Sequence, residues 1–192
     1  MPPKVKITKE DIINAALDLI RSGGEFAINA RSIARELNCS TQPVFSNFAT
    51  MEELQSAVIT AAYELYLGFI KLEVESGKYP QYKAFGMAYI RFAKEERELF
   101  KLLFMRDRTG EDTSLSPDFN QSVQIIMDTN KISYEDAMMI HLEMWACVHG
   151  IGTMIATSFL SLDWDLISDM ISDVYQGIRI RYVSEGNDNE SN

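Results

Sequence analysis

The stretch NARSIARELNCSTQPVFSNF, residues 29–48, decides how the first part of this chain folds. Its opening asparagine, Asn29, has a side chain that caps helix starts well, and apolar residues at helical spacing follow it. We therefore predict a short helix over residues 30–37. Asn38 and Cys39 are then expected to form a tight turn that ends this helix.

A second short helix is expected directly after this turn. We expect Ser40 to cap it, which places Pro43 third in the helix, where a backbone N–H has no helical acceptor to lose. Two short helices joined by a few residues form a helix-turn-helix, in which the second helix has a polar N-terminus. Any compact packing of three helices would give a similar pattern, so the pattern alone leaves both interpretations open.

Helical signals continue on both sides of this stretch. Thr8 with Asp11, and Thr50 with Glu53, have the spacing of N-terminal capping boxes, and Gly23-Gly24 supplies a helix end. Besides the two helices above, the predicted helices cover residues 8–22, 51–76, 81–94, 96–106, 118–130, 134–160 and 164–183. The chain is thus predicted to be all-α, with about nine helices.

Charge is distributed unevenly along the 192 residues, whose formal net charge is -10. Residues 1–50 hold six basic and five acidic side chains, whereas residues 51–192 hold 12 basic and 23 acidic ones. An acidic body does not exclude DNA binding by the first region, because salt screens charges beyond a Debye length of about 8 Å. No stretch of 18 apolar residues and no signal peptide occurs, which predicts a cytoplasmic protein without membrane contact.

Signals for catalysis are weak. His141-Leu142-Glu143 has the H-x-E spacing of zinc deaminases, but no P-C-x-x-C follows it. No HExxH, GxSxG or phosphate-binding glycine loop occurs, and two cysteines, Cys39 and Cys147, are too few for a metal knuckle or a disulfide framework. We predict that the protein is not an enzyme and holds no cofactor and no metal.

Four strings carry a family resemblance: T-x-x-D-I-I-x-A-A-L-x-L-I from Thr8, R-S-I-A-R-E-L-N-C-S from Arg31, P-V-F-S-N-F from Pro43, and E-E-L from Glu52. Together they closely resemble the DNA-binding head of the tetracycline-repressor (TetR) family of bacterial transcription regulators. The resemblance implies a homodimeric regulator, a repressor released from a palindromic double-stranded DNA operator by a small-molecule effector. It implies a helix-turn-helix head over 1–50 and a ligand-binding and dimerisation domain over 51–183. Residues 184–192 hold no apolar side chain to bury, which predicts a disordered tail.

The resemblance also implies which residues meet DNA, since the family places its third helix in the major groove. Gln42 can pair with adenine, while Thr41 and Pro43 can contact a thymine methyl group. The full predicted set is Arg31, Ser40, Thr41, Gln42, Pro43, Phe45, Ser46, Asn47 and Thr50. Phe45 and Met51 stand where the family commonly has tyrosine and lysine, which predicts weaker, less salt-dependent binding. The alternative is an all-α ligand-binding or protein-interaction dimer with weak or lost DNA binding.

The body is rich in methionine and aromatic residues, which suit a pocket for varied apolar ligands and equally suit an ordinary core. The candidate pocket residues are Tyr63, Tyr66, Met87, Phe92, Phe104, Met105, Met127, His141 and Trp145. The last two helices carry an apolar stripe at helical spacing, which predicts a dimer interface or an internal core. The candidate interface residues are Ile151, Ile155, Ile167, Ile171, Val174 and Ile178.

Overall fold

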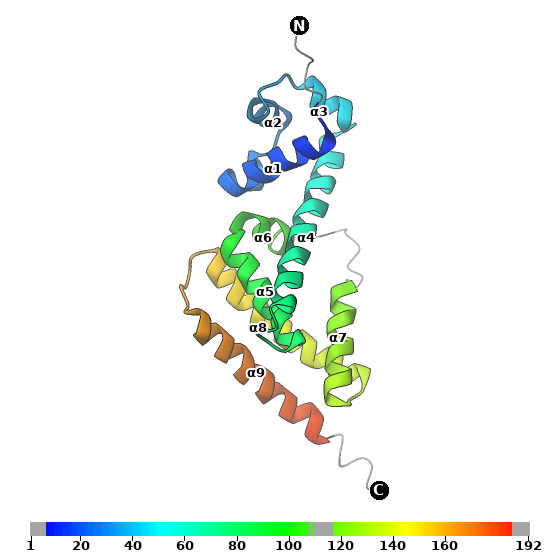
Figure 1. Cartoon of the computed structure of the whole chain (residues 1–192), viewed down its shortest axis with the longest axis vertical. Helices are drawn as coiled ribbons and strands as arrows, with labels where there is room; N and C mark the ends of the chain where they lie inside the picture. Colours follow the sequence, from blue (N-terminus) through cyan, green and yellow to red (C-terminus); the bar gives the residue numbers. More distant parts are fainter. Residues whose placement is uncertain (1–6, 108, 110–116, 186–192) are drawn as a thin grey trace. The chain divides into compact units, whose positions relative to one another are not determined.

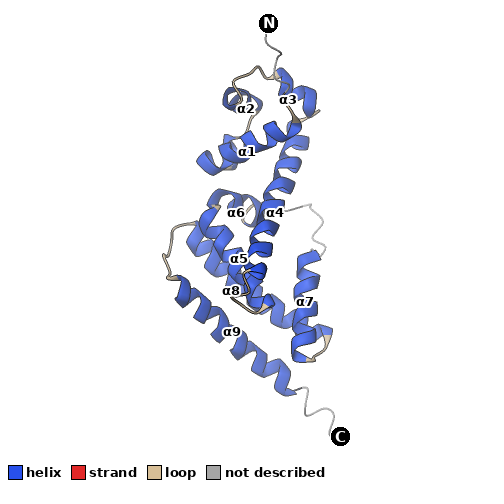
Figure 2. Ribbon diagram, in the orientation of Figure 1, coloured by secondary structure: helices blue, strands red, loops and turns tan. Residues whose placement is uncertain are grey.

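The computed structural model describes residues 7–107, 109 and 117–185, and these residues form helices joined by loops, without a strand (Figures 1 and 2). In chain order the elements are α1 (Lys9–Gly23), the 3-10 helix η1 (Glu25–Ala27), α2 (Ala30–Glu36), α3 (Gln42–Asn47), α4 (Met51–Glu75), α5 (Gln81–Glu95), α6 (Arg97–Phe104), α7 (Pro117–Asn130), α8 (Tyr134–Ala156) and α9 (Trp164–Glu185). The predicted all-α fold is confirmed.

The chain divides into two compact units. The first contains the described residues up to Gly68 together with Glu95–Arg106, and the second contains Phe69–Lys94 and the described residues from Asp107 onward. Helix α4 therefore contributes to both units. The functional boundary expected at residue 50 stays a prediction, and most of the expected tail, 184–192, lies outside the described residues.

The first unit is built on the inner faces of α1 to α4. Helix α1 packs against α2 and α6, and α2 packs against α3 (Figure 1). The covered side chains are Ile12, Ala16 and Ile20 of α1, Ile33 of α2, Val44 of α3, and Leu54, Val58 and Ala62 of α4. Those of α1 and α4 recur every four residues, the spacing that places side chains on one helix face.

Both ends of α1 follow local signals in the sequence. Thr8 Oγ1 accepts a hydrogen bond from the Asp11 amide at 3.1 Å, and Asp11 Oδ2 accepts one from the Thr8 amide at 2.8 Å. These hydrogen bonds with Thr8 lower the pKa of the Asp11 carboxyl. After the helix, Gly24 adopts a φ of 74°, a left-handed conformation that favours glycine. The predicted capping box and glycine stop are confirmed.

The second unit contains most of α5, in which seven of the 15 residues are buried. Helix α8 packs against α7 and α9. The backbone of α5 also approaches both α8 and α9 closely, because a Cβ atom at Gly86 would lie 3.3 Å from Val148 Cγ2 and 3.9 Å from Ile171 Cδ1. A side chain at this position would push against α8, so glycine permits the close packing.

Several helix ends differ from prediction, and the differences at α8 and α3 have a clear cause in the backbone. The helix expected over 134–160 ends at Ala156, because Ser158 takes a φ of 58° and the Phe159 amide turns back to the Met154 carbonyl. Ser40 does not cap α3. Thr41 precedes α3 instead, with a helical backbone and no capping bond from its side chain, so Pro43 is second in the helix and not third.

Candidate functional site

The start of α2 is fixed by the side chains of Asn29 and Ser32. Asn29 Oδ1 accepts hydrogen bonds from the backbone amides of Arg31 and Ser32, at 3.1 and 2.9 Å. In return Ser32 Oγ accepts from the Asn29 amide and donates to the Ala27 carbonyl at 2.7 Å. These bonds satisfy amides that a helix start leaves without partners. The predicted Asn29 cap is confirmed.

The turn between α2 and α3 depends on Asn38. Its φ of 49° is left-handed, a conformation that asparagine adopts more readily than most residues. The chain reverses there, and the Cys39 amide donates to the Ala34 carbonyl at 2.8 Å. The predicted tight turn is confirmed, and it brings α3 against α2 within the first unit.

Helix α3 has one buried and one exposed face. Val44 and Phe48 point inward, with 1% and 3% of their surface exposed, and so hold the helix to the rest of the head. Gln42, Phe45 and Ser46 point outward. Phe45 is 54% exposed, so about half of its surface is available to a partner. The outward face is therefore polar and aromatic, and it carries no charge.

Two of the outward polar groups are already engaged. Ser46 Oγ donates to the Gln42 carbonyl at 2.8 Å, and Asn47 Nδ2 donates to the Pro43 carbonyl at 2.8 Å and to the Ile7 carbonyl at 3.5 Å. The Gln42 side chain has no hydrogen-bond partner among the described residues. Within α3, Gln42 is thus the side chain with an available amide.

Thr50 caps α4. Its Oγ1 accepts from the Glu53 amide at 3.1 Å, while Glu53 Oε2 accepts from the Ala49 amide at 2.7 Å. Glu53 also pairs with Lys9 Nζ at 3.3 Å, and the hydrogen bonds from Ala49 and Lys9 lower the pKa of its carboxyl. The predicted capping pair is confirmed, and it gives Thr50 a structural role beside its predicted contact with DNA.

The positive charge of the helix-turn-helix lies on α2. Arg31 and Arg35 are four residues apart and therefore share a helix face. Both are exposed, and neither forms an ion pair with a residue that the structure describes. No charged residue occurs from Leu37 to Met51. The two helices thus differ in chemistry, since α2 exposes cationic side chains and α3 exposes uncharged ones.

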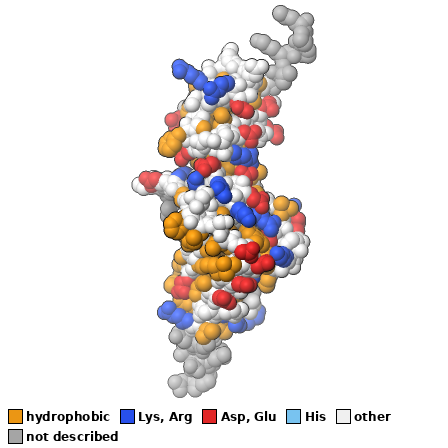
Figure 3. All heavy atoms as spheres, turned by 90° about the vertical axis from the view of Figure 1, so that its left-hand side faces the viewer, with side chains coloured by type: hydrophobic (Ala, Val, Ile, Leu, Met, Phe, Trp, Pro, Cys, Tyr) orange, Lys and Arg blue, Asp and Glu red, His pale blue; other side chains and the backbone are white. Residues whose placement is uncertain are grey.

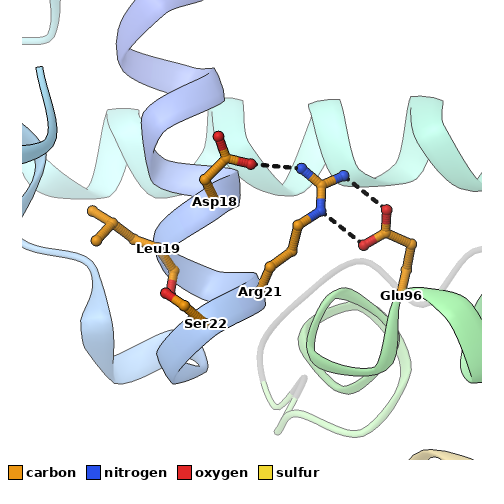
Figure 4. A network of polar contacts seen from close by, with 5 residues as sticks. All are labelled: Asp18, Leu19, Arg21, Ser22 and Glu96. Atoms are coloured by element: carbon orange, nitrogen blue, oxygen red, sulfur yellow. Dashed lines mark hydrogen bonds and ion pairs between the residues drawn. The ribbon is translucent and has the colours of Figure 1, made fainter.

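A long-range ion pair that the sequence did not predict ties α1 to the start of α6 (Figure 4). Arg21 Nε and Nη2 donate to the two oxygens of Glu96 at 2.9 and 2.8 Å, and Nη1 donates to Asp18 at 2.9 Å. The Glu96 carboxylate raises the pKa of the Arg21 guanidinium. Planar, two-point geometry of this kind fixes orientation as well as distance.

In the second unit, both histidines of α8 meet tyrosines of α5. Tyr82 Oη lies 2.9 Å from His141 Nδ1, and Tyr89 Oη lies 2.7 Å from His149 Nδ1. Burial raises the pKa of both phenols and lowers the pKa of His149. The histidines therefore contribute to packing between α5 and α8.

Helix α9 is joined to its neighbours by other polar side chains. Lys83 Nζ of α5 donates to Ser168 Oγ and Ser172 Oγ, both at 2.7 Å. Near the other end of α9, Arg179 Nε donates to Asn130 Oδ1 at 2.6 Å, while Asn130 Nδ2 donates to Tyr175 Oη at 3.0 Å. Because these bonds join helices distant in sequence, they specify which helices pack together.

The predicted pocket residues are distributed over both units. In the first unit the Tyr66 ring packs 5.8 Å from that of Tyr63 and 5.3 Å from that of Phe104, measured between centroids. Met105, also in this unit, is 40% exposed. The three rings therefore contribute to the packing of α4 against α6.

The other five pocket candidates belong to the second unit. Met87 and Phe92 are completely buried, Met127 and His141 are half-buried, and Trp145 is 49% exposed. A side chain that lines an enclosed cavity is mostly covered. Trp145, like Met105, is partly exposed in the single chain. A lining role for all nine residues stays a prediction.

The predicted interface stripe is turned inward. Ile151, Ile155, Ile167 and Ile171 are buried within a single chain, and Val174 and Ile178 are half-buried. The first four are core residues of the second unit, as the alternative of an internal core predicts, and a role of this stripe at a dimer interface stays a prediction. The exposed apolar side chains of this region are others: Met139, Leu142 and Trp145 of α8, Phe159 and Leu160 after it, and Leu166 and Ile180 of α9.

Apolar side chains gather on one face of the second unit (Figure 3). Figure 3 shows apolar groups gathered around the segment between α8 and α9 and the start of α9. Met139, Leu142 and Trp145 are three residues apart, so they follow one side of α8. Exposed apolar side chains that are grouped on a protein surface commonly mark an interaction site.

Residues 82–173 match the family model described as "Tetracyclin repressor-like, C-terminal domain". This match begins in α5, ends in α9, and complements the resemblance of the head. This part of the chain is therefore similar to the C-terminal domain of TetR-family proteins. No curated protein matches the sequence. Among the described residues, no group of three His, Cys, Asp or Glu could hold a metal ion. None of its described helices is long and apolar enough to cross a membrane.

Solved structures share the TetR fold. A protein of unknown function from Rhodococcus sp. RHA1 superimposes with a TM-score of 0.73 at 21% identity, covering 92% of this chain and 97% of the other. A TetR-like transcriptional regulator from the same organism gives 0.68 at 16% identity, with coverage of 92% and 96%. A TetR family member from Streptomyces coelicolor A3 gives 0.56 at 14% identity, with coverage of 86% and 96%.

Proposed function

We propose that this protein is a homodimeric DNA-binding transcriptional regulator, a repressor that a small-molecule effector releases from a palindromic operator. The observation that carries the proposal is that α3 has one buried face and one exposed face. Val44 and Phe48 anchor it to the head, while Gln42, Phe45 and Ser46 face outward. A short helix held in this way presents its first turn to the major groove of duplex DNA.

The two helices of the motif take different parts of the DNA. Arg31 and Arg35, exposed on one side of α2, supply the cations that phosphates attract. Phosphate contacts position a protein on the duplex, and contacts to base edges distinguish sequences. Gln42 supplies the available amide for such a contact. We infer that binding is moderately salt-dependent, since α3 itself adds no cation.

A second copy of the chain would cover the exposed apolar face of α8 and α9. Gly150 of α8 and Gly177 of α9 support this arrangement, because a Cβ at either position would meet nothing within 4 Å in the single chain. Glycine inside a helix costs about 1 kcal/mol relative to alanine, and close approach of a partner helix would account for that cost. Two-fold symmetry then predicts a palindromic operator.

For the effector response, we propose that α6 carries the signal to the head. Helix α6 follows α5 directly in the chain, and Arg21 and Glu96 fix its start to α1. A ligand that favours one position of α6 would bias α1 and hence the spacing of the two heads. Coupling of this kind typically amounts to about 1–3 kcal/mol.

We further infer that the protein acts by binding alone, without a catalytic step, cofactor or metal, and that it acts in the cytoplasm on chromosomal DNA. The proposed head comprises residues 1–50, and the proposed ligand-binding and dimerisation domain comprises residues 51–183. The candidate effector is a small molecule of largely apolar character, because the side chains of the second unit are mainly apolar and aromatic.

The proposal is tested by selecting duplexes from a random library at low salt with the full-length protein. We expect an enriched palindrome, and we expect Gln42→Ala to bind DNA with a relaxed base preference. If no duplex binds more tightly than random DNA, the proposal fails. The second candidate, a ligand-binding or protein-interaction dimer that has lost DNA binding, would then be favoured, as the uncharged stretch from Leu37 to Met51 allows.

The dimer is tested separately by sedimentation. Gly150→Leu and Gly177→Leu each place a bulky side chain where the single chain has open space, so we expect intact helical content and a shift toward monomer. Gly68→Leu on α4 is the matched control, since a Cβ there also meets nothing within 4 Å. Unchanged association of both variants would contradict an interface at these glycines.

A further inference from the structure

We propose that the head reads A·T base pairs, with Gln42 bound to adenine and the ring of Phe45 packed on thymine methyl groups. The inference rests on the proposed function, because it names the base chemistry that the same helix recognises. Its starting point is the outward face of α3, where an available amide and a half-exposed aromatic ring occur together.

The first step concerns guanine. Guanine presents two acceptors in the major groove, and arginine or lysine is the side chain that commonly pairs with both. Helix α3 and its flanks, from Leu37 to Met51, contain neither. Lys9 is engaged with Glu53 at 3.3 Å, and its Nζ lies 4.8 Å from the centroid of the Phe48 ring. The groove-facing helix therefore lacks the usual reader of G·C pairs.

The second step concerns hydrogen-bond donors. The Ser46 hydroxyl donates to the Gln42 carbonyl, and the Asn47 amide donates to the Pro43 carbonyl at 2.8 Å. Gln42 alone on α3 keeps an amide donor and an amide acceptor for a base. Adenine offers one acceptor and one donor side by side in the major groove, and this pair matches a carboxamide.

The third step concerns the aromatic ring. Phe45 is three residues after Gln42, so the two side chains share a helix face. A phenyl ring has no hydroxyl to bind a phosphate, and 54% of Phe45 is exposed in the free protein. The C5 methyl of thymine is the apolar group that the major groove offers, and phenylalanine is among the residues that contact it. Pro43 adds an apolar surface at the same helix start.

The test uses the duplex selected from the random library, with each thymine in turn replaced by deoxyuridine. This replacement removes only the C5 methyl and keeps base pairing. At the thymine that contacts Phe45, we expect an affinity loss of about fourfold, the factor that corresponds to one buried methyl-sized group at about 0.8 kcal/mol. The Phe45→Ala protein should bind both duplexes equally. Phe26→Ala, which removes a 98% exposed ring outside α3, should keep the discrimination.

The outcomes separate the inference from the proposed function. A selected operator with G·C pairs under α3, or equal affinity for all thymine and deoxyuridine duplexes, would overturn the A·T inference while DNA binding stands. Failure to bind any duplex would overturn the proposed function and the inference together. Because the methyl group is removed from the DNA, the wild-type measurement does not depend on the folding of a variant.

Discussion

Polar contacts of short and of long reach hold the two compact units. In the first, the helix starts are fixed by side chains three residues apart, as in Thr8 with Asp11 and Asn29 with Ser32. In the second, Lys83 of α5 contacts Ser172 of α9, 89 residues later. Local contacts set the geometry of individual turns, whereas long-range contacts decide which helices pack together. The helix starts of the head are therefore specified locally, whereas the packing of α1 against α6 and of α5 against α9 is specified by tertiary contacts.

The largest effect is expected where a long-range contact is buried. Asn130→Ala removes the partner of Arg179 Nε and Tyr175 Oη, leaving two half-buried polar groups without this partner. We expect a loss of about 1–3 kcal/mol in the free energy of unfolding, measured with denaturant. Gln124→Ala on the same helix is the control, since Gln124 is exposed. Equal losses in the two variants would refute the role of Asn130.

The local contacts of the head should cost less to remove. Asn29→Ala deletes the α2 cap, and we expect a loss of about 1 kcal/mol. Hydrogen exchange should accelerate mainly at the amides of α2, because the bonds lost are confined to its first turn. Asn29→Ser, which keeps a capping oxygen, should stay close to wild type. A uniform acceleration across both units would contradict a local role.

The Arg21 and Glu96 pair is long-range but partly exposed, so its contribution to stability should be smaller. Solvent-exposed ion pairs contribute roughly 0–1 kcal/mol, and salt weakens them. Arg21→Ala should therefore lower stability by less than about 1 kcal/mol, and the difference from wild type should shrink in high salt. Arg35→Ala, which removes an exposed arginine without an ion pair among the described residues, provides the baseline. A larger loss that salt leaves unchanged would show that Arg21 acts through packing.

The smallest expected effect is on the pH dependence of stability, through His149. Burial lowers the pKa of His149 from its ordinary value of 6.5, so the unfolded chain binds a proton more readily than the folded one. This contribution to stability is complete above pH 6.5 and is lost as the pH falls through the lowered pKa. His149→Gln should flatten the stability profile below pH 6.5. An identical profile in the variant would assign acid sensitivity to other groups.

The reach of the contacts also explains what the sequence could predict. Capping residues and turn residues act within a few positions, and so Asn29, the Asn38 turn and the limits of most helices follow from the residues themselves. Ser40 failed as a cap because Thr41 already takes a helical backbone, a choice that two adjacent hydroxyl residues leave open. The bond between Arg21 and Glu96, 75 residues apart, has no local signal.

The inward-facing apolar stripe of α9 shows a second limit of prediction from the sequence. Ile167 and Ile171 have the spacing of an apolar helix face, but the same spacing serves a core and a dimer interface equally. Only the fold shows that these two are buried within one chain while Leu166 and Ile180 stay exposed. Pocket residues are hard to predict for the same reason, since Met87 and Phe92 are core by burial and pocket candidates by composition.

The most direct test of the central claim is hydrogen exchange of the full-length protein with and without its selected duplex at low salt. If α3 lies in the major groove, exchange should slow at residues 40–48 and at the first turn of α2, where Arg31 approaches phosphate. Protection confined to α8 and α9, or no protection anywhere in the head at saturating duplex, would contradict DNA recognition by α3.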